Sequence, residues 1–271
     1  MIIFTAEDHK YESIDTENKI NWISVTSLVS LFKLPFEKEE IAQKCSINKK
    51  SKWYGLTPEK ILEHWGNTNK TALNLGSWYH DQREQDTIAC DTIQRLGKDL
   101  SIVKPLIDGD KKIAPDQSMV EGIYPEHMVY LESAGVCGQA DRVEVVQDTL
   151  NVFDYKTNKE IKMKGFKSWQ GIVTKMLHVC SHLDECNYNH YALQLSIYMY
   201  IMLKHNPNLK AGRIVLEHIK FEIDSVDEWD NPLYAYDAQG DPIVKEVKTY
   251  ELPYLKKEVQ RMFEYYKKNG K

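Results

Sequence analysis

Three β-rich runs lie close together between residues 126 and 157, and they constrain the fold more than any other part of the sequence. They read EHMVYLE, VCGQADRVEVVQ and LNVFDYKT, and only a few residues separate each from the next. Val, Tyr and Phe favour strands, and short connections join antiparallel neighbours. Asp148 and Thr149 separate the last two runs, which predicts a hairpin there. We therefore expect a β-sheet in the middle of the chain.

Helical patterns flank these strands on both sides. Residues 25–95 are expected to be mostly helical, with Thr57 as the N-cap of one helix and Pro58 at its first position. A longer helix is expected over residues 71–96, with core positions at Leu75, Tyr79, Ile88 and Ile93. Before them, residues 1–24 predict a hairpin that turns near Asp15–Asn18.

The second half of the chain predicts a helix at NHYALQLSIYMYIMLKH and a strand at GRIVLEHIKFEI. A polar excursion follows near residues 225–247, and YLKKEVQRMFEYYKK predicts a closing helix. We interpret the whole chain as one α/β domain with an N-terminal helical elaboration. Within it we distinguish an N-terminal hairpin and helical part (1–75), a core (76–222) and a C-terminal part (223–271).

Composition and charge exclude several classes of protein. Hydrophobic residues make up 42% of the 271 residues, but no apolar run approaches the ~20 residues of a membrane helix. The start, MIIFTAEDHK, is too short and too quickly acidic for a secretory signal. Five cysteines without a compact framework fit a reducing compartment, so we expect a cytoplasmic protein. The net charge of −5 means that a nucleic-acid partner would need a local basic surface.

Acidic and basic side chains gather at the end of the third run. Asp154 and Lys156 are two residues apart, so in a strand they project from the same face. A hairpin that turns at 148–149 would place Asp141 nearly opposite Lys156. The two carboxylates could hold a hard cation such as Mg²⁺, and the lysine could orient water or stabilise charge on a phosphate. The alternative is a solvated surface pair, because Asp-x-Lys alone is a weak motif.

In its wider context this group resembles the PD-(D/E)XK nuclease superfamily, in the RecB-type branch that includes phage and mitochondrial exonucleases. The matching pieces are GSWYHDQRE, PEHMVYLESAGVCGQADRV, FDYKTNKE and QLSIY, in the order of that branch across residues 76–198. SVTSLVSLF and GLTPEKILEHW also resemble the helical lead-in of its phage members. The resemblance implies a central mixed sheet flanked by helices. It also implies a DNA nuclease that uses Mg²⁺ or Mn²⁺.

The resemblance further implies a metal shell and a catalytic lysine. His80, Asp141, Asp154 and the backbone carbonyl of Tyr155 would be metal ligands, and Lys156 would be the catalytic lysine. Glu126 matches an acid that joins the metal shell or serves the fold. For His80 an alternative remains, because Glu84 lies four residues further along the same predicted helix and the two could form a surface pair.

Two further residues match the Q-x-x-x-Y element of that branch. Gln194 would position the lysine or a phosphate, and Tyr198 would support it. They are one helical turn apart and therefore share a face. Tyr198 could instead be a core aromatic, because its helix is apolar on nearly every face. A buried glutamine amide needs a partner, which favours a role for Gln194 in the site.

The segment after Lys156 is rich in lysine. Residues 156–175 contain six lysines and one acid, with Phe166 and Trp169 between them. This pattern is typical of a segment that follows a phosphate backbone and stacks on bases, and a solvated charge run is the alternative. We expect DNA contacts from Lys159, Lys162, Lys164, Lys167, Trp169, Lys52 and Trp53. For Trp53, packing between the N-terminal helices is an equal alternative.

A second group of metal-binding residue types occurs in HVCSHLDECNYNH. On one continuous helix its residues 178, 182, 186 and 190 would form a stripe ~18 Å long, too long for one ion. The iron–sulfur branch of the superfamily needs three cysteines after the Q-x-x-x-Y helix, and no cysteine follows Cys186. We therefore expect neither zinc nor an iron–sulfur cluster.

The resemblance favours an exonuclease that acts on DNA ends or single strands in phage-type replication or recombination, inside a bacterial or phage-infected cell. A structure-selective or nicking endonuclease is the first alternative. A catalytically silent DNA-binding module is the second, and the intact Asp141, Asp154 and Lys156 argue against it. No membrane contact is expected.

Overall fold

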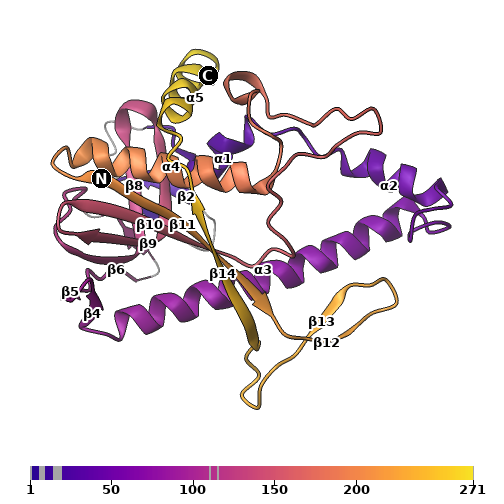
Figure 1. The fold of residues 1–271 in the computed structure, drawn as a ribbon, viewed down its shortest axis with the longest axis horizontal. Helices are drawn as coiled ribbons and strands as arrows, with labels where there is room; N and C mark the ends of the chain where they lie inside the picture. The colour runs from indigo at the N-terminus through magenta and orange to yellow at the C-terminus, as the bar shows by residue number, and fades with distance from the viewer. Residues whose placement is uncertain (1, 6–9, 15–19, 110, 115, 271) are drawn as a thin grey trace.

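A mixed sheet of six strands forms the centre of the molecule (Figure 1). The computed structural model describes residues 2–5, 10–14, 20–109, 111–114 and 116–270. The strand order is β14–β11–β10–β9–β3, and β8 pairs with the other part of β9. The strands are β3 (Ile23–Ser24), β8 (Gly122–Leu131), β9 (Val136–Val146), β10 (Thr149–Lys156), β11 (Lys210–Phe221) and β14 (Val244–Leu252). The mixed α/β class predicted from the sequence is thereby confirmed.

The predicted hairpin between β9 and β10 is confirmed, but its register differs from the expected one. Val146 pairs with Thr149, so the turn consists of residues 147–148. Phe153 pairs with Arg142, and one residue further along Asp141 lies opposite Asp154. The expectation that Asp141 would face Lys156 was wrong by two residues. The turn lies at residues 147–148 and not at 148–149. A shift of one residue at the turn moves every pair along the two strands by two residues, so Asp141 lies opposite Asp154 and not opposite Lys156.

Five α-helices are found in the described part of the chain: α1 (Val25–Ser30), α2 (Lys38–Ile47), α3 (Pro58–Ile88), α4 (Asn187–His205) and α5 (Lys256–Asn269). α3 begins as predicted, because the Thr57 side chain accepts a hydrogen bond from the Lys60 amide. It ends at Ile88, so the expected continuation to Ile93 was wrong. Ile93 lies in β4 (Thr92–Arg95), which pairs with β5 (Lys98–Ser101). The β-branched pair Thr92–Ile93 favours that strand.

α4 crosses one face of the central sheet and forms most of the core (Figure 1). It is the crossover between the parallel strands β10 and β11. Leu193, Leu195 and Ile197 have no exposed surface, and full burial of such a side chain contributes about 2 kcal/mol. α1 and α5 cover α4. The position of this helix fixes which of its side chains reach the end of β10.

The N-terminal hairpin differs from the expected one. β1 (Ile2–Thr5) pairs with β2 (Lys10–Ser13), so the chain reverses before residue 10, and the expected turn at 15–18 lies outside the described residues. β1 also pairs with β7 (Lys111–Ile113), which pairs with β6 (Leu106–Asp108). This second sheet buries Ile2 and Phe4 against Met128 and Cys137 of β8 and β9. β3 joins the central sheet instead of the hairpin.

The expected polar excursion contains strands. β12 (Ile223–Val226) pairs with β13 (Pro232–Tyr234), and β14 pairs with β11 as an edge strand. Most of β14 is exposed, and four of its nine residues are charged, so the apolar alternation that identifies a half-buried strand is missing there. The boundary drawn at residue 75 falls inside α3. Among the described residues, every helix is too short or too polar to cross a bilayer.

A buried histidine makes the stability of the fold depend on pH. Burial lowers the pKa of the His127 imidazole to about 4, and its Nε2 has no hydrogen-bond partner among the described residues. The unfolded chain takes up this proton near pH 6.5, but the folded protein resists it until about pH 4. The free energy of unfolding therefore falls by about 3 kcal/mol on account of His127 as the pH drops from about 6.5 to 4.

We expect His127→Phe, which keeps a planar ring, to remove this part of the acid sensitivity. The free energy of unfolding, measured by urea denaturation at pH 7, 5.5 and 4, should fall less steeply in the variant than in the unmodified protein. Parallel pH dependences in the two proteins would contradict the assignment.

Candidate metal centre

Three side chains from separate elements converge at one end of the sheet. His80 comes from α3, Glu126 from β8 and Asp141 from β9. His80 Nδ1 lies 3.5 Å from Asp141 Oδ2 and 3.7 Å from Glu126 Oε1. One ligand atom of each lies within 4.8 Å of the others, so the group could hold a metal ion. Two carboxylates and one imidazole suit Mn²⁺ or Mg²⁺ better than a thiophilic metal.

Glu126 reaches this position through an unusual backbone conformation. The strand pairing aligns Pro125 with Arg142 and His127 with Ala140, so Glu126 lies directly opposite Asp141. Its φ is +46°, in the left-handed region that a non-glycine residue in a strand rarely adopts. Such a residue costs on the order of 1–3 kcal/mol and often marks a functional site. The sequence left open whether Glu126 joins the metal shell or serves the fold, and the structure places it within the group that could hold a metal ion.

Asp154 lies beside the group without belonging to it. Its side chain is 1% exposed, and Oδ2 forms an ion pair of 2.5 Å with Lys156 Nζ. Apart from this ion pair, both of its oxygens are buried with no hydrogen-bond partner among the described residues. Burial, together with the neighbouring charge of Asp141, raises the pKa of Asp154 to about 6. A buried oxygen without a donor is the condition that a cation or its bound water would satisfy.

The backbone of Tyr155 connects these side chains. Its amide donates a hydrogen bond to Asp141 Oδ2 (2.7 Å), and its carbonyl accepts one from Lys156 Nζ (3.3 Å). The same carbonyl lies 3.2 Å from His80 Nε2. The Tyr155 side chain points to the other face, where its hydroxyl accepts from Arg142 (2.9 Å). The predicted alternation, with Asp154 and Lys156 on one face and Tyr155 on the other, is confirmed.

The charges of the site are mutually dependent. Burial disfavours the charged form of His80, but Asp141 and Glu126 outweigh burial and raise its pKa to about 9. Burial likewise opposes the charge on Lys156, whereas Asp154 and Asp141 raise the pKa of that ammonium above its ordinary value. Both cations therefore compensate the carboxylates at neutral pH. A metal ligated by His80 would have to displace its proton.

A cleft of about 920 Å³ is lined by His80, Glu126, Asp141 and Lys156, and it also contains Gln194 and Tyr198. The two share a face of α4 as predicted, and Gln194 Nε2 donates to the Tyr198 hydroxyl (3.4 Å). Gly138 faces them from β9, and a Cβ there would come within 2.8 Å of the Tyr198 ring. Close approach of α4 to β9 therefore requires glycine at this position.

Tyr191 is a site residue that sequence reasoning missed. Its ring centroid lies 5.2 Å from Lys156 Nζ, and its hydroxyl donates to Asn158 Oδ1 (2.6 Å). It precedes Gln194 by three residues, so helical periodicity on the Q-x-x-x-Y face could have indicated it. Glu84, the alternative partner of His80, pairs instead with Lys112 at 2.9 Å.

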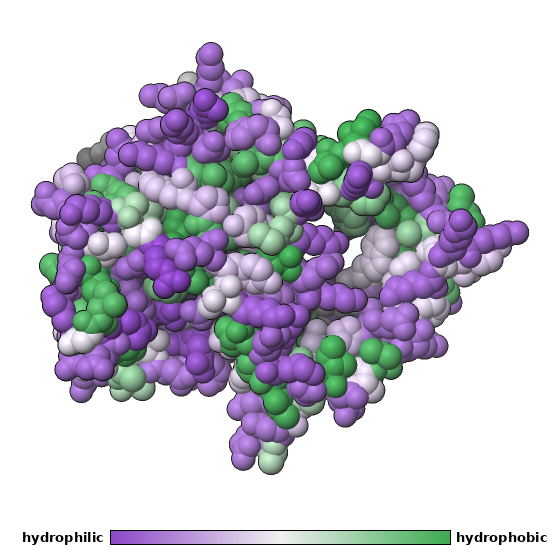
Figure 2. All heavy atoms as spheres, in the orientation of Figure 1, coloured by the Kyte–Doolittle hydropathy of each residue, from purple (hydrophilic) through white to green (hydrophobic). Residues whose placement is uncertain are grey.

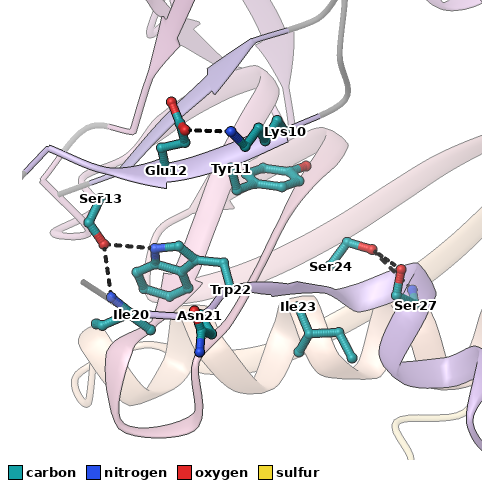
Figure 3. A pocket seen from close by; sticks show the side chains of 10 residues that line it. All are labelled: Lys10, Tyr11, Glu12, Ser13, Ile20, Asn21, Trp22, Ile23, Ser24 and Ser27. Carbon is teal, nitrogen blue, oxygen red and sulfur yellow. Dashed lines mark hydrogen bonds and ion pairs between the residues drawn. The ribbon is translucent and has the colours of Figure 1, made fainter.

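A second pocket, of about 690 Å³, extends the cleft past the N-terminal sheet (Figure 3). Both hollows are lined by Tyr11, Ser24 and Ser27. Figure 3 shows Trp22 beside Ile20 at one end, where its Nε1 donates to Ser13 Oγ (3.0 Å). No pattern in the sequence predicts this pocket, because its walls come from separate segments of the chain.

The cysteine- and histidine-rich segment is dispersed in the structure. His178 stacks on Tyr265, His182 lies 3.2 Å from Glu258, and His190 lies 2.7 Å from Glu185. The segment is also broken, since a 3₁₀ turn at His178–Cys180 precedes the start of α4. Within the described ranges, the group of His80, Glu126 and Asp141 is the one whose geometry fits a metal ion.

Trp53 packs inside the N-terminal helical part. It is 7% exposed, and its ring stacks on Trp229 at 5.3 Å. Lys52 donates to the Trp229 carbonyl and lies over the Trp53 ring. The expected stacking of Trp53 on a base is therefore corrected in favour of packing, because neighbouring rings already cover the indole. The other expected DNA contacts, Lys159, Lys162, Lys164, Lys167 and Trp169, are all exposed between β10 and α4.

Comparison with models of known protein families finds no match to this chain. A search of curated proteins likewise finds no matching sequence. The resemblance to the PD-(D/E)XK superfamily therefore depends on the residues and their spacing alone.

We expect Glu126→Gln to weaken Mn²⁺ binding more than about tenfold, because even outer partners of a metal site typically contribute 10–100-fold. Isothermal titration of the purified protein with MnCl₂ would measure this. Glu84→Gln is the matched control, since Glu84 lines the same cleft, is similarly buried and pairs with Lys112. Equal loss of affinity in both variants would indicate general attraction of a cation to an acidic cleft.

Proposed function

We propose that the protein is a metal-dependent DNA nuclease with a core of the PD-(D/E)XK type. The observation that carries the proposal is the group of His80, Glu126 and Asp141 next to a buried Asp154–Lys156 pair. Carboxylates and an imidazole beside a charged lysine are what metal-assisted hydrolysis of a phosphodiester needs. Asp154 and the Tyr155 carbonyl would complete the shell of Mg²⁺ or Mn²⁺.

When bound, the metal would supply a Lewis acid and lower the pKa of a water molecule. Lys156 remains charged between Asp154 and the Tyr155 carbonyl, so it can hold that water or stabilise the negative charge of the transition state. Tyr191 restricts the position of the ammonium from the side of α4. Gln194, held by Tyr198, presents its amide to the same cleft.

An opening beside the cleft supports action on a strand with a free end. Figure 2 shows the molecule hollowed between its main body and the part that holds α2 and the start of α3. Protein contacts enclose this region. Gly76 of α3 packs against the Thr157 side chain, the Leu34 amide donates to Glu185 Oε2 (3.2 Å), and Phe36 lies against Trp65. The cleft includes Leu73, Gly76 and Thr157, so it borders the opening.

We expect Lys156→Ala to reduce cleavage of DNA by about 10²–10³-fold, the usual effect of removing one group that stabilises transition-state charge. The assay is release of labelled fragments from single-stranded DNA in Mg²⁺ and in Mn²⁺. Lys112→Ala is the matched control, because Lys112 is also a 21%-exposed lysine paired with an acid in this cleft. If the protein were a silent DNA-binding module, the unmodified protein and both variants would bind DNA without cleaving it.

We expect linear single strands to be cleaved at least about tenfold faster than circles of the same sequence, since a closed ring of protein admits a free end and excludes a circle. Gel analysis of the two substrates under identical conditions would measure the ratio. Equal rates would identify an endonuclease with an open cleft, and the nuclease proposal would stand in that form.

A further inference from the structure

The proposed cleavage chemistry leaves one prominent feature unused, an arm formed by residues 165–174. The Thr174 amide donates to the Phe166 carbonyl, and the Ser168 amide donates to the Ile172 carbonyl, both at 2.8 Å. Gly171, with φ of +83°, allows the reversal between them. Figure 1 shows the loop before α4 extending from the body of the protein toward α2.

The base of the arm is held firmly. Asp184 accepts a hydrogen bond from the Gly165 amide (3.2 Å) and pairs with Lys175 (2.5 Å). The Glu185 amide donates to the Thr174 carbonyl (3.0 Å). The two sides of the arm approach so closely that a Cβ on Gly165 would lie 2.3 Å from the Thr174 carbonyl oxygen. The arm therefore has a fixed base and a projecting tip.

The tip presents large apolar side chains to solvent. Trp169 is 92% exposed, Phe166 74% and Ile172 64%, and Met163, just before the arm, is 56% exposed. Single exposed apolar residues are ordinary, but four within ten residues form a patch that indicates a binding surface. Lysines 162, 164 and 167 alternate with them. Aromatic rings interleaved with cations match a nucleic acid, which offers stacked bases beside phosphates.

We propose that this arm is a strand-separating wedge for the ends of duplex DNA. Trp169 would take the place of the opened terminal pair and stack on the pair beneath it, while the neighbouring lysines contact phosphates of the diverging strand. An aromatic ring that stacks on a base replaces the base–base stacking lost at one terminal step. The separated strand could then enter the cleft. The inference rests on the proposed function and deepens it, because it names duplex ends as a substrate.

A binding experiment tests the wedge without any cleavage. A blunt duplex carries 2-aminopurine at its terminal pair, and the full-length protein is added in EDTA. We expect fluorescence to rise as the base unstacks, and the rise to fall at least fivefold in Trp169→Ala. Leu96→Ala is the matched control, because Leu96 is 86% exposed at the turn of the β4–β5 hairpin, beyond the opposite end of α3. No rise with the unmodified protein, or an equal rise with Trp169→Ala, would overturn the proposal.

A cleavage experiment separates this inference from the proposed function. Blunt duplex is compared with the same duplex carrying an unpaired fork. We expect Trp169→Ala to slow cleavage of the blunt end at least tenfold and of the forked end less than twofold. Equal slowing on both would overturn the wedge and leave the nuclease. An opened end with no cleavage in Mg²⁺ or Mn²⁺ would overturn the nuclease and leave the wedge.

The same exposed patch could instead contact a lipid surface, and tryptophan fluorescence distinguishes the two. We expect the emission assigned to Trp169, taken as the difference from Trp169→Ala, to change on addition of blunt duplex. A blue shift with phosphatidylserine vesicles, without any change on addition of duplex, would overturn the proposal.

Discussion

The compensation of buried charge at the end of β10 is the interaction on which the site depends. Glu126, Asp141 and Asp154 bring three carboxylates together, and His80 and Lys156 supply two cations. Like charges at this spacing repel strongly where water is excluded. The pKa of His80 is raised because the acids stabilise its proton, and that of Asp154 is raised because burial and Asp141 oppose its charge. With both cations charged, one negative charge is in excess. Ligation of a metal by His80 would displace its proton and raise the excess to two, which a divalent cation would balance.

The surrounding fold keeps these groups at fixed distances. The paired strands β8, β9 and β10 set the spacing of the three acids, because Glu126 faces Asp141 and Asp141 faces Asp154 across neighbouring pairs. The α4 crossover brings Gln194 over the same strand ends, and Gly138 allows the close approach. His80 lies on α3, which precedes β8, β9 and β10 in the chain. Each side chain of the site thus comes from a helix or a strand. Such rigid elements suit a centre that must hold a metal ion and a phosphate at fixed positions relative to each other.

An aromatic cluster packs beside the opening next to the cleft, where Trp65 contacts both Phe36 and Trp53. Trp53 stacks on Trp229, so the β12–β13 connection is attached to the N-terminal helices. This contact links residues more than 170 positions apart. It is the reason why Trp53, expected to meet DNA, is buried. The exposed lysines and apolar side chains that could contact a DNA strand lie instead in the segment between β10 and α4.

Local sequence patterns were enough to predict most of the helices and strands and to propose which residues form the site. Strong β-branched runs identified β8, β9 and β10, an apolar helix identified α4, and the capping pair Thr57–Pro58 identified the start of α3. Short-range periodicity carries this information, and it also placed Asp154 and Lys156 on one face. The strand register, the edge strand β14, the second sheet and the place of Glu126 in the metal group became clear only from the folded structure. These depend on contacts between distant segments and on one left-handed backbone residue, neither of which local periodicity encodes.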